Sequence, residues 1–269
     1  MDKTAETPAH IRKEVKTPGK LSRMFLSFYD VCQFVTRFFK EGFLPPYEGK
    51  ELMRQCYDIG YRSLALISLT GFITGIVFTK QSRPSLAEFG ATSWLPSLVG
   101  IALLRTLAPL LTSLIAAGKV GSSIGAELGS MRVTEQIDAM EVSATNPFKF
   151  LVTTRVLAST ITIPILTFYT AMVGMLGALL NVSLFEDTSA RAFFQMSLES
   201  ITFLDITAST VKAIIFGFTI GIVGCYQGYN SSKGTEGVGK AANSAVVIGM
   251  FLIFIEEIIS VQFFSLFRT

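Results

Sequence analysis

The chain has 269 residues, of which 50% are hydrophobic and 16% are charged, and its formal net charge is +3 at pH 7. Its mean hydropathy of +0.51 indicates a membrane protein, and lipid excludes every spanning structure except helices and closed barrels. The only histidine is His10, and the three cysteines lack metal-type spacing. We therefore expect no His-based catalytic triad, no metal site and no nucleic-acid partner.

The N-terminal region is predicted to lie outside the bilayer. Residues 1–20 are rich in Lys, Glu, Thr and Pro, which is typical of a disordered tail. From Leu21 to Phe39 apolar residues recur at helical spacing, while polar residues such as Arg23 and Arg37 occupy the other side. This pattern predicts an amphipathic helix in the membrane interface, with a linker, over residues 21–56. The alternative is a helix that packs on a soluble core, but no soluble domain follows.

Five apolar stretches follow, at residues 63–79, 95–117, 156–185, 213–232 and 241–267. A bilayer core of about 30 Å needs roughly 20 mainly apolar residues per helix, so each stretch can span. The second stretch contains Arg105, and the fifth contains Glu256 and Glu257. The chain is therefore predicted to be an all-α integral membrane protein with an interfacial helix and five transmembrane helices.

The distribution of Lys and Arg predicts the orientation of these spans. Most basic residues fall in segments 1–62, 118–155 and 229–240, whereas segments 80–94 and 186–205 and the C-terminal end hold few. Because basic loops stay on the cytoplasmic side, the N-terminus is predicted to be cytoplasmic and the C-terminus to lie across the membrane.

The polar segment 118–155 has two parts. From Ala116 to Ser130 it is crowded with small residues, which allow helices to approach closely. Residues 131–142 can form a short helix with Val133, Ile137 and Met140 on one face and acidic residues on the other. This helix is predicted to dock in a groove on a cytoplasmic partner, and the alternative is a solvated loop helix. The candidate coupling residues are Arg132, Glu135, Gln136, Asp138 and Glu141.

The run AELGSMRVTEQIDAMEV, with the flanking sequence from ALLRTLAP to LVTTRVLA, and a second block, GYNSSKGTEGVGK, closely resemble the MlaE-type permeases. These are membrane subunits of ABC transporters that act with MCE proteins in lipid traffic across the Gram-negative envelope. The resemblance implies a permease domain over residues 57–269, a homodimer and a coupling helix between spans two and three. It also implies the bacterial inner membrane, with the C-terminus in the periplasm.

The partners that the resemblance implies are a cytoplasmic ABC ATPase dimer, a periplasmic MCE-domain protein, phospholipid and, as a further candidate, a small STAS-type cytoplasmic subunit. The chain has no G-x-x-x-x-G-K-[ST] phosphate loop, so ATP and Mg are expected on the partner ATPase and no cofactor on this chain. The chain itself is therefore predicted to be a transporter subunit rather than an enzyme.

Charged residues within the spans are the candidates for lipid translocation. A charge at the centre of a span costs about 2.5–3.5 kcal/mol on insertion scales, so such residues are expected to face one another, a cavity or a protomer interface. The sequence differs from the usual family pattern next to Arg105: this chain has LLRTLAP where LLRELGP is usual. The candidates are Arg105, Thr106, Glu256 and Glu257, together with Asp205 and Lys212, which lie two helical turns apart near the outer end of the fourth span. Snorkelling to the interface is an alternative explanation for Lys212.

The predicted function is that of an ABC permease subunit that moves phospholipid between the inner membrane and an MCE partner and so supports outer-membrane lipid asymmetry or homeostasis. Two other classes stay open. A secondary transporter would be active without any ATPase, although the sequence has no convincing internal repeat. A membrane assembly factor would keep its function after Arg105, Glu256 and Glu257 were replaced.

Overall fold

The computed structural model describes residues 20–42, 45, 48–185 and 189–266, and of residues 20–28 only the backbone. The predicted tail over residues 1–20 thus lies almost wholly outside the described residues. The described part of the chain is helical and contains no strand. Its elements are α1 Lys20–Gly42, α2 Gly49–Glu88, η1 Thr92–Trp94, α3 Leu95–Ala102, η2 Leu103–Leu107, α4 Ala108–Ala116, η3 Ala117–Gly121, α5 Ser122–Val133, α6 Gln136–Val142, η4 Phe148–Thr153, α7 Thr154–Phe185, α8 Ala190–Glu199, α9 Phe203–Tyr229 and α10 Thr235–Ser265.

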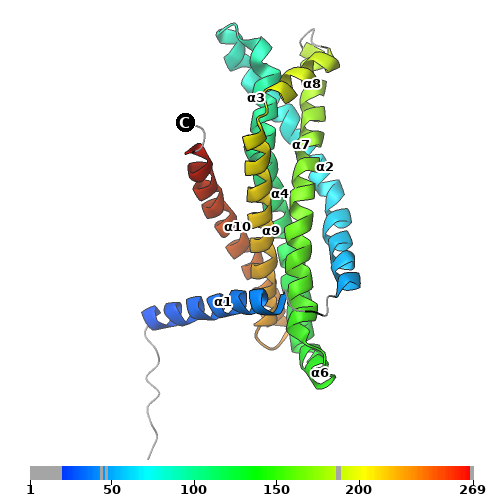
Figure 1. Cartoon of the computed structure of the whole chain (residues 1–269), viewed down its shortest axis with the longest axis vertical. Helices are drawn as coiled ribbons and strands as arrows, with labels where there is room; N and C mark the ends of the chain where they lie inside the picture. The colour runs from blue at the N-terminus through cyan, green and yellow to red at the C-terminus, as the bar shows by residue number, and fades with distance from the viewer. Residues whose placement is uncertain (1–19, 43–44, 46–47, 186–188, 267–269) are drawn as a thin grey trace, which may run out of the picture.

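Five helices are long and apolar enough to cross a membrane, which confirms the predicted number of spans. They cover Gly49–Glu88, Thr92–Val133, Phe148–Phe185, Phe203–Tyr229 and Thr235–Ser265. Each begins before or ends after the apolar stretch found in the sequence, because helical hydrogen bonding continues into polar flanks where water can also satisfy side chains. Figure 1 shows these helices side by side, with α1 crossing one end of the bundle nearly at right angles to them.

The second span differs most from the prediction. Residues 118–133, which were predicted to lie in a cytoplasmic segment, form η3 and α5 and continue the helix of the second span without a loop. The small residues of this part do bring helices together, as predicted. A side chain at Gly125 would lie 3.2 Å from the carbonyl oxygen of Ala241 on α10. A Cβ added at Gly228 on α9 would lie 2.8 Å from the carbonyl oxygen of Gly125.

Helices α2 and α7 are also held together by glycines. A Cβ added at Gly75 would overlap the backbone carbonyl of Gly174, and one added at Gly177 would overlap the carbonyl of Phe72. Small residues at such positions allow the backbones to make van der Waals contact, which is the main attraction between helices in lipid. This contact fixes the position of α2 against the centre of the bundle.

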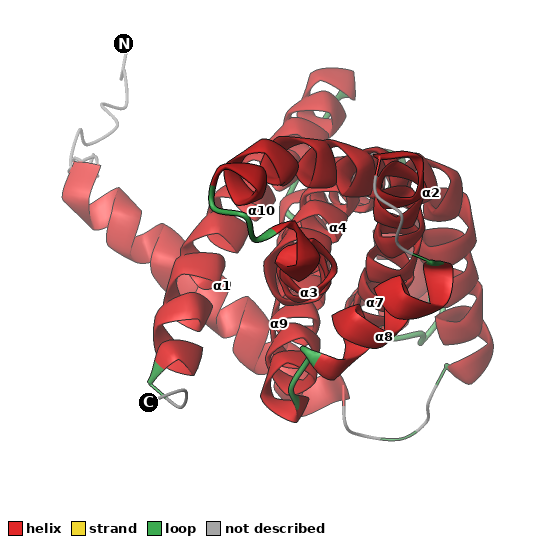
Figure 2. Ribbon diagram, turned by 90° about the horizontal axis from the view of Figure 1, so that it is seen from above, coloured by secondary structure: helices red, strands yellow, loops and turns green. Residues whose placement is uncertain are grey.

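Helix α1 is attached to the bundle through two aromatic residues. Phe34 and Phe38 are buried, and Phe34 contacts the rings of Phe148 and Tyr226 at centroid distances of 5.0 and 5.4 Å. Tyr29 and Phe39 on the same helix are exposed. Figure 2, a view along the bundle, shows α1 extending outward from the other helices. This arrangement fits a helix that lies in the membrane interface and is anchored at one end.

Candidate functional site

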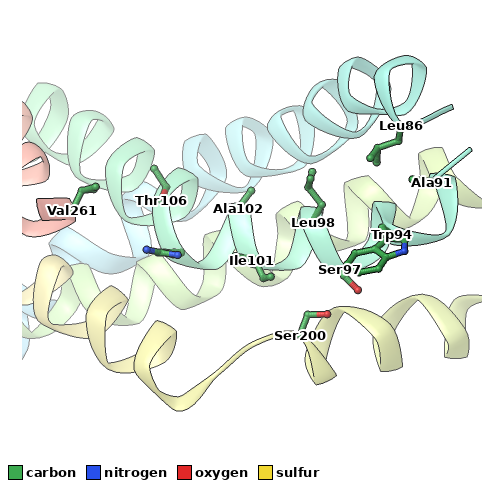
Figure 3. A pocket seen from close by; sticks show the side chains of 11 residues that line it. Leu86, Ala91, Trp94, Ser97, Leu98, Ile101, Ala102, Thr106, Ser200 and Val261 are labelled. Carbon is green, nitrogen blue, oxygen red and sulfur yellow. The ribbon is translucent and has the colours of Figure 1, made fainter. Parts of the chain in front are cut away.

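A cavity of about 780 Å³ opens between the second span and its neighbours at the end of the bundle distant from α1. Its wall is mostly apolar and includes Trp94, Leu98 and Ile101. Arg105 and Thr106 also line it, and Figure 3 shows Thr106 toward the same end as Val261, with Trp94 and Ser97 at the other end. The remaining lining residues are Leu86, Ala91, Ala102 and Ser200. A long apolar cavity with a cation near one end can hold an amphiphilic molecule with an anionic group.

Arg105 faces a carboxylate from the fourth span. Its Nε lies 3.9 Å from Oδ1 of Asp205, whose side chain is almost fully buried. Asp205 is fixed by a capping box at the start of α9, where its other oxygen accepts hydrogen bonds from the hydroxyl and backbone N–H of Thr202 at 2.7 and 3.1 Å. The cap therefore presents Asp205 in one orientation toward Arg105.

Lys212 pairs with the fifth span. Its Nζ donates to Oε1 of Glu257 at 2.7 Å, and it also lies 3.4 Å from the carbonyl oxygen of Arg105. That carbonyl is available because Pro109, four residues later, has no N–H to donate to it. The π-helical turn Leu103–Leu107 lies at this place, and such turns often occur at functional positions in helices. One lysine thus connects the second, fourth and fifth spans.

Glu256 has a different partner from Glu257. Its carboxylate accepts a short hydrogen bond from the hydroxyl of Thr219 on α9. Among the described residues, the second carboxylate oxygen of Glu256 and that of Glu257 are both buried without a hydrogen-bond partner. Buried oxygens of this kind are costly unless a proton, water or ligand satisfies them.

The ion pairs differ from those predicted. Arg105 was expected to face Glu256 and Glu257, a cavity or a protomer interface. It does line the cavity, but its carboxylate neighbour is Asp205, and the partner of Glu257 is Lys212. Snorkelling of Lys212 is wrong, because this side chain is only 2% exposed. Asp205 and Lys212 do share one face of α9, as their spacing predicted, and both side chains are buried inside the bundle.

The predicted coupling segment forms two helices instead of one. Helix α5 ends at Val133, and Glu135 takes a left-handed conformation with φ of 58° before α6 begins at Gln136. Ile137 is fully buried in the core, whereas Asp138 and Glu141 are exposed. The amphipathic division predicted from the sequence therefore holds for α6, but the segment is broken before it.

Ion pairs and hydrogen bonds fix the position of α6. The Arg132 guanidinium contacts Asp138 at 2.6 Å across the break, and Glu135 lies 4.0 Å from Lys233 in the turn between α9 and α10. After α6, the Asn146 amide donates to Glu41 of α1 at 2.9 Å. Figure 1 shows α6 as the element that projects farthest at the α1 end of the bundle. A helix with one buried face and an exposed acidic face at this place can bind a partner.

A further ion pair was missed by the sequence analysis. Arg155, only 3% exposed at the start of α7, contacts Glu127 of α5 at 2.8 Å. Both residues flank apolar stretches, and the only signal for their pairing was that each is a charge close to a membrane span. Their contact holds the start of α7 against α5.

Comparison with known proteins places this geometry in a family context. Residues 52–263 match the family model described as Permease MlaE. A probable ABC transporter permease protein of Rickettsia prowazekii is 38% identical over 82% of this chain and 85% of its own length. One from Synechocystis is 36% identical over 84% of this chain and 88% of its own. The chloroplastic protein TRIGALACTOSYLDIACYLGLYCEROL 1 of Arabidopsis thaliana is 31% identical over 80% of this chain and 61% of its own.

Proposed function

This chain belongs to the MlaE permease family, and from that membership we propose that it is the membrane subunit of an ABC transporter for phospholipid. In this proposal it resides in the bacterial inner membrane with a cytoplasmic N-terminus and a periplasmic C-terminus. It exchanges phospholipid with a periplasmic MCE-domain partner and so supports outer-membrane lipid homeostasis. The name of the Arabidopsis relative is that of a glycerolipid, which favours a lipid cargo.

The observation that carries the proposal is the cavity beside Arg105. An apolar space of about 780 Å³ can take acyl chain segments, and the guanidinium at its end can donate charge-assisted hydrogen bonds to a phosphate. Asp205 lies at 3.9 Å, too far for a close hydrogen bond. The cation is therefore partly neutralised and still able to bind an anion, which suits a site that must also release its cargo.

In this proposal, α6 transmits the free energy of ATP hydrolysis from the ATPase to the spans. The chain forms a homodimer, and each α6 docks on one subunit of a cytoplasmic ATPase dimer that binds ATP and Mg. A small STAS-type subunit is a further candidate partner on the same side. Ile137 anchors α6 in the core shared by α5, α7 and α9, so a displacement of α6 would be transmitted to the spans. The chain then only changes the side of the membrane to which a lipid site opens.

The proposal is tested by reconstituting the purified chain with its ATPase partner in vesicles that contain fluorescent phospholipid, and measuring transfer to an acceptor MCE protein. We expect transfer that requires hydrolysable ATP. Transfer at the same rate without the ATPase would identify a secondary transporter. Absence of transfer, with normal cell-envelope assembly restored by a variant lacking Arg105, Glu256 and Glu257, would identify an assembly factor.

A further inference from the structure

A second cavity, polar rather than apolar, lies at the opposite end of the second span. It occupies about 400 Å³ between the first half of α2 and the η3–α5 part of the second span. Its lining includes Arg54, Asp58, Arg62 and Ser63 of α2 and Lys119 and Glu127 of the second span. Lys119 is separated from Arg105 by roughly 21 Å along the helix at 1.5 Å per residue. The two cavities are thus distinct, and we name this one the α2–α5 groove.

Two polar groups in the α2–α5 groove lack the partner that each would normally have. Ser63 is 1% exposed, and its hydroxyl has no hydrogen-bond partner among the described residues. The Lys119 ammonium donates to the backbone carbonyl of Arg62, and within the described part of the chain no carboxylate lies within ion-pair distance of it. A buried hydroxyl and a half-buried cation without a counter-charge are both stabilised when an anion binds between them.

The other charges in the groove have both signs. Arg62 lies 3.2 Å from Asp58 and Arg54 lies 3.8 Å from Glu51, both within α2, and the arginines are 70% and 74% exposed. Exposed pairs within one helix contribute little, so a ligand can exchange with them. On the opposite wall Glu127 is 52% exposed, and its Oε1 contacts Arg155 at 2.8 Å. The groove therefore presents cations for an anion and carboxylates for a second, positively charged group.

The groove lies at the depth of lipid head groups. Tyr57 and Tyr61 stack on α2 with centroids 5.1 Å apart, and they are 60% and 63% exposed. Exposed tyrosines at the end of a span mark the boundary between lipid and water. Farther along α2, Leu66, Leu69 and Ile73 are exposed in the apolar region, where they can contact acyl chains.

From these observations we infer that the α2–α5 groove binds the zwitterionic head group of a phospholipid from the adjacent leaflet. Lys119, Arg62 and the Ser63 hydroxyl hold the phosphate, and Asp58 and Glu127 hold the ammonium of an ethanolamine-type head group. The inference depends on the membrane setting of the chain and not on the proposed transport, so each can fail without the other.

The test uses the purified full chain without an ATPase, in phosphatidylglycerol vesicles that contain a small amount of phosphatidylethanolamine with a diazirine near the top of one acyl chain. After irradiation, mass spectrometry maps the labelled peptides. We expect labelling of segments 51–66 and 119–127. Arg62→Gln combined with Lys119→Gln should lower that labelling at least about tenfold, because two charge-assisted hydrogen bonds to the phosphate are lost.

Two further variants make the result specific. Ser63→Ala changes no charge and should lower the labelling about fivefold, as expected for one neutral hydrogen bond. Lys233→Gln removes an exposed cation from the turn between α9 and α10 and should change nothing. Unchanged thermal unfolding in detergent in every variant shows that the bundle is still folded.

Three outcomes would overturn the inference. Labelling of 51–66 and 119–127 that is absent, or equal in the double variant, removes the site. Equal labelling by a matching phosphatidylglycerol probe removes the ammonium from the assignment. Loss of labelling on addition of millimolar inorganic phosphate identifies free phosphate as the occupant in place of a lipid head group.

Discussion

At the scale of single residues, Arg105 and Lys212 each have a carboxylate neighbour supplied by a different helix. Arg105 of the second span faces Asp205 of the fourth, and Lys212 of the fourth faces Glu257 of the fifth. Thr106, which follows Arg105, cannot neutralise a cation. The carboxylate that faces Arg105 comes instead from a residue held by a helix cap.

Replacement of Arg105 by alanine is expected to lower lipid transport by at least about tenfold, because a charge-assisted hydrogen bond to the cargo is lost. Membrane insertion should be intact, since removal of a cation makes insertion easier. The measurement is transfer of fluorescent phospholipid in reconstituted vesicles, with Lys50→Ala as a control at an exposed position. Unchanged transfer would exclude Arg105 from the transport mechanism.

Replacement of Glu257 by glutamine is expected to lower stability by about 3–5 kcal/mol, because it leaves the buried Lys212 cation without a counter-charge. Adding Lys212→Met should restore most of that loss. Glu256→Gln serves as the matched control, since its neighbour in the structure is a hydroxyl. Thermal unfolding in detergent measures all four proteins. If Arg105→Ala restored the stability and Lys212→Met did not, Glu257 would be paired with Arg105 and not with Lys212.

At the scale of elements, the exposed acidic face of α6 is predicted to couple ATP hydrolysis by the partner ATPase to lipid transport. Reversing the charges of Glu135, Asp138 and Glu141 together should release the ATPase, or uncouple hydrolysis from transport, while the spans stay folded. A single substitution is expected to show little, because an exposed ion pair contributes about 0–1 kcal/mol. Co-purification and the ratio of ATP hydrolysed to lipid moved are the measurements.

Asp138 also pairs with Arg132 within the chain, so a control is needed for loss of that contact. Arg132→Gln breaks the same pair and keeps the acidic face. If it releases the ATPase as strongly as the triple reversal, the effect comes from the position of α6 and not from its charge. Normal assembly and transport in the triple variant would refute the coupling assignment.

The contact between α2 and α7 depends on glycine. Gly75→Ala is expected to destabilise the bundle by about 1–3 kcal/mol, because its methyl group would overlap the backbone of Gly174. Gly239→Ala, in α10 with open space around it, is the matched control and should be neutral or stabilising by up to about 1 kcal/mol. Thermal unfolding in detergent separates the two. Equal midpoints would show that α2 is free to shift on α7.

At the scale of the whole molecule, the bundle has two chemically different ends. In the cysteine-free background made by replacing Cys32, Cys56 and Cys225 with alanine, a cysteine at Ser232 should be protected from an impermeant thiol reagent in intact cells. A cysteine at Ser85 should be labelled. Both positions are exposed; Ser85 lies in the last turns of α2, and Ser232 lies between α9 and α10. The last turns of α2 and the turn between α9 and α10 lie at opposite ends of the bundle (Figure 1). The opposite labelling pattern would reverse the predicted orientation.

The sequence by itself determined the number of spans and the amphipathic faces of α6. Both depend on hydrophobicity summed over a window of neighbouring residues, which needs no knowledge of distant contacts. It also determined that Asp205 and Lys212 share a face, because that follows from helical periodicity. The sequence did not predict the break before α6, because the left-handed residue there is Glu135 and no glycine or proline marks it.

Only the tertiary structure decided which carboxylate faces which cation, and that Lys212 points inward. Arg105 and Asp205 are on different helices far apart in sequence, and their contact depends on how each helix is rotated about its axis. That rotation is set by close packing at residues such as Gly75 and Gly125 and by the opening of the backbone at Pro109. These are interactions between helices, so no pattern within one helix can specify them.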